Sequence, residues 1–206
     1  FRGGGNPMTT WFTSDSHFSH ARILELGAGR PFKDIHEHNE ILIKNWNDVV
    51  AYDDVVYHLG DVALGPWPEG LDCVKRLNGY KVLVPGNHDR ISSVEKQSRR
   101  ERYRDDYDSA FQDIEPEVTH FTFGNQVVLL SHYPYNGDSQ KDRERYADLR
   151  AVDNGLPLIH GHNHCGPAER ESVSLRGTPQ FAVGVDANDW TPVHEDAILE
   201  WLSRVT

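Results

Sequence analysis

Five short polar segments of this chain each follow an apolar run and carry side chains that bind metal ions. They are Asp15-Ser16-His17, Gly60-Asp61, Gly86-Asn87-His88-Asp89, Ser131-His132 and Gly161-His162-Asn163-His164. Imidazole, carboxylate and amide ligands without thiolates suit divalent ions such as Mn, Fe, Zn, Co or Mg. A single segment of this kind occurs by chance in many proteins. All five in this order indicate a binuclear metal site.

A binuclear site of this composition predicts hydrolysis of a phosphate ester. Two neighbouring metals need a shared ligand, and a carboxylate has two oxygens for that purpose. Metals roughly 3.5–4 Å apart can share a hydroxide and stabilise the attacking and leaving oxygens of an in-line displacement at phosphorus. They also lower the pKa of bound water towards about 7. A nucleophile would therefore exist at neutral pH.

The segments must be positioned by a rigid scaffold, and the runs before them are typical of short buried strands. These runs are rich in β-branched and aromatic residues and cover residues 10–13, 55–59, 81–84, 127–130, 156–159 and, after the last segment, 181–185. Open α/β sheets place their sites at the carboxyl ends of strands. The pattern therefore predicts an α/β fold with the ligands gathered at one edge.

Helical patterns lie between the predicted strands. A 3.6-residue apolar period between residues 35 and 50 predicts a helix, with His36 and His38 on its exposed side. A shorter helix runs from Leu71 to a C-cap at Asn78-Gly79. Three polar segments remain: residues 91–113 and 138–151 are densely charged and predicted to form exposed helices of unassigned role, and 166–180 a loop or hairpin.

Length and composition limit the classes of protein to which this chain could belong. The 206 residues suit one domain over residues 8–206, and the Gly-rich residues 1–7 before Met8 are expected to be an expression remnant or a disordered start. The formal charge of −11 disfavours long nucleic acid as a partner. Two cysteines give no disulfide framework, and no stretch is apolar enough for a membrane span. We expect a cytoplasmic protein, whose oligomeric state the sequence does not predict.

As a set, the five segments resemble the calcineurin-like metallophosphoesterase family, whose pattern is D-x-H, G-D, G-N-H-[DE], H and G-H-x-H. The resemblance spans residues 15–164. It implies a four-layer αββα sandwich of two mixed sheets flanked by helices. The protein Ser/Thr phosphatases of this family carry G-D-x-V-D-R-G, whereas this chain reads Gly60-Asp61-Val62-Ala63-Leu64-Gly65 and has Asp89 in place of Glu. The chain is therefore more similar to small bacterial and phage phosphodiesterases.

The resemblance also implies roles for individual residues. Asp15, His17 and His164 match ligands of a first metal, Asp61 the bridging carboxylate, and Asn87, His132 and His162 ligands of a second metal. His88 matches the family's non-ligand histidine, which assists the leaving group or stabilises phosphoryl oxygens. Two divalent ions are expected, with Mn favoured and Fe, Zn or Co as alternatives.

Four further residues follow the ligands and are candidates for substrate contact: His20, Arg22, Tyr133 and Asn136. Three of them have a structural alternative, because His20 could cap a helix start while Tyr133 and Asn136 could stabilise their loop.

The leading functional hypothesis is a phosphodiesterase for a small phosphodiester, with a 2′,3′-cyclic nucleotide favoured because its five-membered ring is strained. A nuclease or a nucleotide pyrophosphohydrolase could use the same metals. A non-catalytic scaffold is the third alternative. Such scaffolds usually lose ligands or the His88 equivalent, and none of these is missing here.

Overall fold

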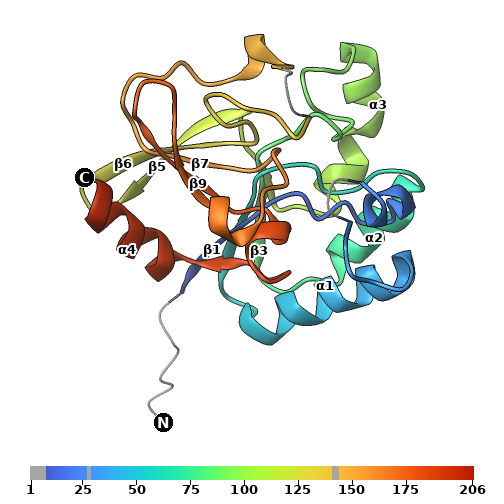
Figure 1. Ribbon diagram of the computed structural model, residues 1–206. Coiled ribbons are helices and arrows are strands. Elements are labelled where there is room, and N and C mark those ends of the chain that lie inside the picture. Colours follow the sequence, from blue (N-terminus) through green and yellow to red (C-terminus); the bar gives the residue numbers. More distant parts are fainter. Residues whose placement is uncertain (1–7, 27–28, 141–143) are drawn as a thin grey trace.

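Two five-stranded sheets pack face to face in the computed structural model, which describes residues 8–26, 29–140 and 144–206 (Figure 1). The first sheet has the order β10-β1-β2-β3-β4. Its strands are β1 (Thr10–Thr13), β2 (Val55–His58), β3 (Tyr80–Leu83), β4 (Asp113–Ile114) and β10 (Val193–His194). Strands β1 to β4 are parallel and β10 is antiparallel to β1. The ligand-bearing loops after β1, β2 and β3 therefore leave the sheet at the same edge.

The second sheet has the order β5-β6-β7-β9-β8. Its strands are β5 (Val118–Phe123), β6 (Gln126–Ser131), β7 (Leu158–His160), β8 (Glu171–Val173) and β9 (Pro179–Ala182). Strands β6, β7 and β9 are parallel, while β5 and β8 are antiparallel at the two edges. Both sheets are mixed, which confirms the predicted α/β sandwich.

One hydrophobic core lies between the two sheets. Phe12 of β1 is fully buried, and its ring lies 5.4 Å from that of Phe121 and 5.7 Å from that of Phe123, both in β5. The C-terminal helix α4 (Glu195–Val205) adds Ile198, Trp201 and Leu202 to this core. Figure 1 shows α4 beside the β10 end of the first sheet, away from α1, α2 and α3.

Three helices cover the outer face of the first sheet. They are α1 (Ile35–Val49), α2 (Trp67–Lys75) and α3 (Gln97–Asp108), and they share a core cluster with strand residues such as Val56 and Leu83. Helix α1 begins at Asp34, whose carboxylate accepts a hydrogen bond from the backbone N–H of Glu37 at 2.9 Å. The predicted helix over residues 35–50 is confirmed.

The predicted position of His38 is wrong. Its side chain is buried, and its Nε2 accepts a hydrogen bond from Arg30 Nη1 at 2.9 Å. The Phe32 ring also packs against it at 5.2 Å. The turn before α1 folds over this part of the helix surface, which the periodicity of α1 alone does not reveal. His36 is exposed, as predicted.

The charged segments are less helical than predicted. Within residues 91–113 only Gln97–Asp108 is helical, and Tyr107 and Phe111 are buried. The expected helix over 138–151 is wrong. Its described residues contain a single 3₁₀ turn, Ala147–Leu149, because the Asp138 carboxylate is buried against Arg145 and Arg150 instead of pairing along a helix.

The hairpin region and the N-terminal residues are also the subject of predictions. Residues 166–180 contain a short 3₁₀ turn and the start of the β8–β9 hairpin, as predicted. Across the part of the chain that the structure describes, no helix has the length and apolar character needed to cross a membrane. The expectation for residues 1–7 lies outside the described residues.

Candidate metal centre

The loops that follow β1 and β2 run side by side. The backbone N–H of Asp15 donates to the carbonyl of Gly60 at 3.0 Å, and that of His17 donates to the carbonyl of Asp61, also at 3.0 Å. At the other side, Ser14 forms a parallel bridge with Gly184, which follows β9 in the second sheet. Backbone pairing therefore brings the ligand candidates of both sheets to one place.

Most of the predicted ligands have an uncommon backbone conformation. A left-handed φ is found at Asp15 (57°), His17 (48°), Asp61 (55°), His162 (73°) and His164 (47°). A non-glycine residue in this region costs on the order of 1–3 kcal/mol and persists only where its surroundings hold it. Such strain concentrates at functional sites, and here five of the seven predicted ligands share it.

Two glycines of the motifs allow the loops to approach one another. A Cβ on Gly86 would lie 2.5 Å from Oδ1 of Asp61, and a Cβ on Gly161 would lie 2.5 Å from Oδ2 of Asp15. Any other residue at these positions would displace a carboxylate. The G-N-H and G-H-x-H segments therefore need glycine for close packing against the two aspartates.

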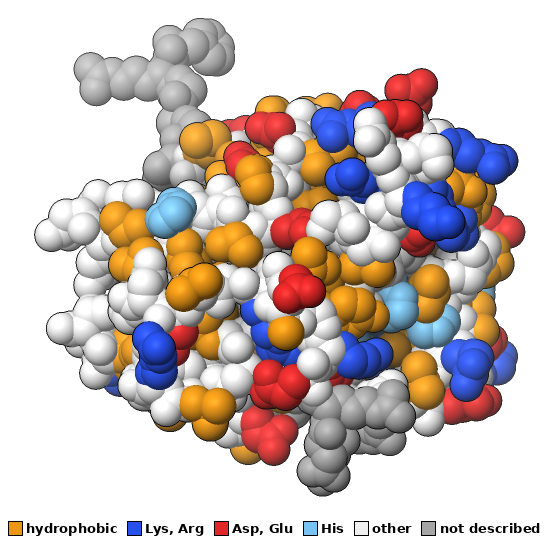
Figure 2. All heavy atoms as spheres, turned by 90° about the horizontal axis from the view of Figure 1, so that it is seen from above, with side chains coloured by type: hydrophobic (Ala, Val, Ile, Leu, Met, Phe, Trp, Pro, Cys, Tyr) orange, Lys and Arg blue, Asp and Glu red, His pale blue; other side chains and the backbone are white. Residues whose placement is uncertain are grey.

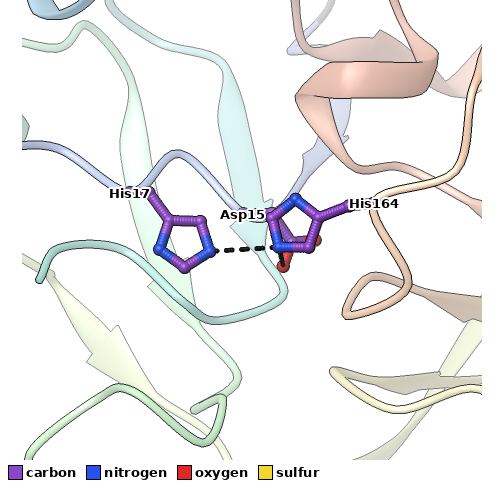
Figure 3. A group of neighbouring side chains, drawn as sticks. All are labelled: Asp15, His17 and His164. Carbon is purple, nitrogen blue, oxygen red and sulfur yellow. Dashed lines mark hydrogen bonds and ion pairs between the residues drawn. The ribbon is translucent and has the colours of Figure 1, made fainter. Parts of the chain in front are cut away.

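Asp15, His17 and His164 form a first ligand group (Figure 3). Nε2 of His164 lies 3.7 Å from Oδ1 of Asp15 and 3.3 Å from Nε2 of His17. Figure 3 shows the two imidazole rings turned toward each other with the carboxylate beside them. Asp15 and His17 come from the loop after β1 and His164 from the loop after β7.

The first group is held by Arg30 and Asp186, which the sequence analysis did not single out. Asp186 accepts a hydrogen bond from Nδ1 of His164 at 2.9 Å and two from Arg30, at 3.0 and 2.9 Å. Arg30 also donates to the carbonyls of Asp15 at 2.7 Å and Ser16 at 3.1 Å. One buried guanidinium thus links both halves of the group.

The charges of this network follow from its contacts. Burial disfavours the Asp186 carboxylate, but the hydrogen bond from His164 and the charge of Arg30 lower its pKa to about 2. Burial lowers the pKa of His164, whereas the charges of Asp15 and Asp186 raise it, and the net result is a raised pKa. Asp186 is therefore ionised at neutral pH and fixes the imidazole orientation.

Asn87, His132 and His162 form a second ligand group, which is more deeply buried. Nε2 of His132 lies 3.2 Å from Oδ1 of Asn87 and 3.2 Å from Nδ1 of His162. The other ring nitrogen of His132 donates to the carbonyl of Leu59 at 2.8 Å. Nε2 of His162 lies 3.4 Å from Oδ2 of Asp138.

The contacts of His132 with Leu59 and of His162 with Asp138 indicate whether the second group can bind a cation. The Leu59 carbonyl only accepts, so the proton of His132 is on Nδ1 and the lone pair of Nε2 faces His162. Nε2 of His162 forms no hydrogen bond with the described residues, but the negative charge of Asp138 3.4 Å away attracts the proton to Nε2, and the Nδ1 lone pair then faces His132. Two lone pairs 3.2 Å apart repel unless a cation lies between them. The second group therefore fits a divalent metal.

The first group can also bind a cation. Oδ1 of Asp15 is buried and has no hydrogen-bond partner among the residues that the structure describes. Buried polar atoms without partners are costly. Oδ1 of Asp15 also faces the His164 nitrogen, so a cation bound there would satisfy the carboxylate.

Asp61 lies between the two groups. Its Oδ2 is 3.6 Å from Nε2 of His17 and 3.5 Å from Nε2 of His132, and its Oδ1 accepts from the backbone N–H of His88 at 2.9 Å. Burial raises the pKa of Asp61, but the charges of His132 and His88 outweigh it and the net pKa is lowered. Asp15 also lies close to Asp61 and His132, so it borders both groups.

His88 differs from the ligand candidates in its exposure. Its side chain is 39% exposed, and its Nε2 lies 3.9 Å from Oδ2 of Asp61. The next residue, Asp89, is fully buried and accepts hydrogen bonds from the backbone N–H groups of Gly86 at 2.8 Å and Asp61 at 2.9 Å. Burial and the nearby Asp61 raise the pKa of Asp89 to about 7. Asp89 therefore fixes the loop that presents His88.

A cavity of about 590 Å³ opens over the first group. His17, His88 and His164 line it, together with His20 and Arg22, two of the four predicted substrate contacts. Burial and the charge of His88 lower the pKa of His20 to about 4, so that ring is neutral. Figure 2 shows a face on which histidine side chains reach the surface beside hydrophobic and basic ones.

The other two predicted substrate contacts do not line this cavity. Tyr133 is fully buried, with its ring 5.0 Å from that of His132 and 5.1 Å from that of His162. Asn136 accepts a hydrogen bond from the backbone N–H of Leu175 at 2.8 Å. Their contacts favour the alternative that both residues stabilise their surroundings.

Sequence reasoning missed Arg30, Asp138 and Asp186. A signal existed for Asp186, because it directly follows the strand-like run 181–185, as the ligands follow theirs. No comparable signal marks Arg30 or Asp138, which lie in loops and reach the centre only through the fold.

Comparison with known proteins gives the family. Residues 8–179 match the calcineurin-like phosphoesterase superfamily domain. The chain is 34% identical over 187 residues to the gene 66 protein of Mycobacterium phage L5, covering 86% of each chain. It is 43% identical over 200 residues to an uncharacterized protein of Methanocaldococcus jannaschii, covering 94% of this chain and 91% of that one.

Among solved structures, a protein of unknown function from Aquifex aeolicus is similar, with 28% sequence identity and a TM-score of 0.70 over 94% of this chain and 99% of that chain. The chain belongs to the calcineurin-like phosphoesterase superfamily. It is thus a metal-dependent phosphoester hydrolase, as the ligand motifs predict.

Proposed function

We propose that this protein is a phosphodiesterase with two divalent metal ions, one at each ligand group, and Asp61 as the shared ligand. The observation that supports this most directly is the position of Asp61 Oδ2, 3.6 Å from His17 and 3.5 Å from His132. When bound, two such ions lower the pKa of coordinated water towards about 7 and offset the charge of phosphoryl oxygens.

His88 supplies a proton to the leaving oxygen in this proposal. Its partly exposed ring lines the cavity, with Nε2 3.9 Å from Oδ2 of Asp61, and its backbone N–H donates to Oδ1 of Asp61. A side chain in this position is free to donate to a substrate atom. General acid catalysis of this kind contributes about 10²–10⁴-fold to a rate.

The cavity supports a small substrate. Its volume of about 590 Å³ lies within the range of roughly 300–1,000 Å³ found for small-molecule sites. The formal charge of −11 disfavours long nucleic acid, and the segment after Asp61 lacks the second Asp and the Arg of protein phosphatases. We propose 2′,3′-cyclic nucleotides as substrates, Mn as the favoured metal and the cytoplasm as the location, where the free Cys73 and Cys165 would remain reduced.

A substrate panel tests the proposal. With Mn present, we expect a higher kcat/KM for 2′,3′-cyclic nucleotides than for 3′,5′-cyclic nucleotides, and little cleavage of duplex DNA or phosphoproteins. Protein carrying Asp61→Ala, purified in the same way, controls for contaminating phosphatases. A higher kcat/KM for 3′,5′-cyclic nucleotides or duplex DNA would overturn the substrate assignment. Preferred cleavage of nucleotide pyrophosphates or oligonucleotides would instead support the nuclease or pyrophosphohydrolase alternatives.

A further inference from the structure

The cavity over the first ligand group contains an excess of positive charge. Arg22, Arg30 and Arg145 line it, against a single carboxylate, that of Asp186, among its described lining residues. Arg30 pairs with Asp186 at nitrogen–oxygen distances of 3.0 and 2.9 Å, and Arg145 pairs with Asp138. Among these described residues the charge of Arg22 is therefore left without a carboxylate partner. In a chain with a formal charge of −11, this local excess focuses attraction on anions that enter the cavity.

Two of these arginines have donors left for a ligand. The side chain of Arg22, which is exposed, forms no hydrogen bond or ion pair with any residue in the described parts of the chain. Arg145 donates from Nε to both carboxylate oxygens of Asp138, at 3.2 and 3.1 Å, and its Nη2 also bonds to Asp138. Asp138 therefore anchors one side of that guanidinium, while its Nη1 has no partner among the described residues.

A different part of the cavity wall is apolar. It is formed by Ile23, Leu26, Leu64, Pro167 and Trp190. Ile23 is buried, and the Trp190 ring is held by the Phe32 ring at 5.1 Å and by the Arg30 guanidinium at 5.6 Å. A flat apolar surface of this kind suits a planar ring such as a nucleobase.

The reacting phosphate does not account for these groups. In the proposed function, its oxygens are met by the metals of the two ligand groups and by His88. The cavity extends beyond them, to Arg22 and Arg145 and to the apolar wall. A ligand that fills it therefore needs a second anionic group and an apolar ring in addition to the diester.

We propose that the preferred substrate is a nucleotide that carries a second phosphate besides the diester that is cleaved, with Arg22 contacting the second phosphate. For a 2′,3′-cyclic nucleotide, the second group is a 5′-phosphate. The base lies against the wall formed by Leu26, Leu64 and Trp190. This inference rests on the proposed function and names the substrate class of the same site.

The test compares adenosine 2′,3′-cyclic phosphate with the same compound carrying a 5′-phosphate, in the presence of Mn. Because charge-assisted hydrogen bonds to phosphate are strong, we expect the 5′-phosphorylated compound to have about a tenfold higher kcat/KM, mainly through KM. Arg22→Gln should bring the ratio of the two values close to one. Arg99→Gln, which removes the same charge from the exposed surface of α3, should leave the ratio as in the wild type.

Three results would overturn the inference: equal kcat/KM values in the wild type, an unchanged ratio in Arg22→Gln, or an equal loss for both substrates in that variant. The last result would mean that Arg22 serves the reacting phosphate.

Calorimetric binding of adenosine 3′-phosphate and adenosine 3′,5′-bisphosphate to the Mn-loaded protein tests the second phosphate site separately from the proposed cyclic substrate. If neither cyclic compound is cleaved, the proposed substrate fails. Tighter binding of the bisphosphate that depends on Arg22 still supports the second phosphate site, and the absence of that preference overturns it.

Discussion

The two ligand groups differ in their access to solvent and to the cavity. In the first group the side chain of His164 is 24% exposed, those of Asp15 and His17 are 1% and 2% exposed, and the two histidines line the cavity. In the second group the side chains of His132 and His162 are 0% and 2% exposed, and neither lines the cavity. A substrate in the cavity would therefore contact the histidines of the first group directly, whereas the second group is not part of the cavity lining.

The groups also differ in what holds them. Arg30 and Asp186 hold the first group through charged hydrogen bonds. The second group has a charged neighbour, Asp138, whose Oδ2 lies 3.4 Å from Nε2 of His162, and it also contacts the backbone carbonyl of Leu59 and the fully buried ring of Tyr133. The first group is therefore open to reactants at His164, whereas the second is enclosed by the core.

The largest effect is expected where the two groups join. Asp61→Ala removes the proposed shared ligand, so both metals should bind more weakly and turnover should fall by at least about 10³-fold. Elemental analysis of the purified variant, together with its rate, measures this. Asp72→Ala, which removes an exposed carboxylate from α2, is the matched control. Two tightly held metals with wild-type rates in Asp61→Ala would contradict the bridging assignment.

A smaller effect should separate chemistry from metal binding. His88→Ala should keep its metal content and lose about 10²–10⁴-fold in kcat, because the proton donor is lost while both ligand groups remain. The loss should be smaller for a nitrophenyl ester, whose leaving group needs little protonation. His36→Ala, at an exposed histidine on α1, should behave as the wild type. Equal losses for good and poor leaving groups would favour charge stabilisation by His88 instead.

The third prediction addresses each group separately. Asp186→Asn should weaken metal binding at the first group, and Asp138→Asn at the second, each by about 10–100-fold, because outer partners orient imidazole ligands. Titration of the metal-free variants with Mn, followed by calorimetry, measures both affinities. Each variant is the control for the other, and thermal unfolding checks that both are folded. If both variants weakened the same metal, the division into two groups would be wrong.

Much of this centre could be predicted because strand ends carry its ligands. The run at residues 10–13 coincides with β1, and the run at 55–59 differs from β2 by one residue. Parallel neighbours then bring Asp15 and Asp61 to the same edge without any further information. Their residue types indicated metal ligands, and the structure places them together.

What could not be predicted depends on long-range pairing. Asp138 and Arg145 lie in a stretch of alternating charges that resembles an exposed helix, yet they pair with each other, and Asp138 lies 3.4 Å from His162. Arg30 contacts Asp186, 156 positions later in the chain, and no local pattern indicates that contact. By contrast, Ile198, Trp201 and Leu202 of α4 show a helical spacing that the sequence analysis did not use.

The smallest predicted effect concerns His38, which supports the first group through Arg30. Burial and the charge of Arg30 lower the pKa of His38 to about 4, so the folded protein keeps it neutral while the unfolded chain binds a proton below about 6.5. Between those values the unfolded state holds more protons, and stability therefore falls as the pH falls from 6.5 to 4. His38→Gln retains an acceptor for Arg30 but does not titrate. We expect the melting temperature of the wild type to decrease more than that of the variant between pH 7 and pH 4.5, measured with chelator present so that metal loss does not contribute. If the melting temperatures of the two proteins decreased equally across this range, His38 would not be held neutral by the network around the first ligand group.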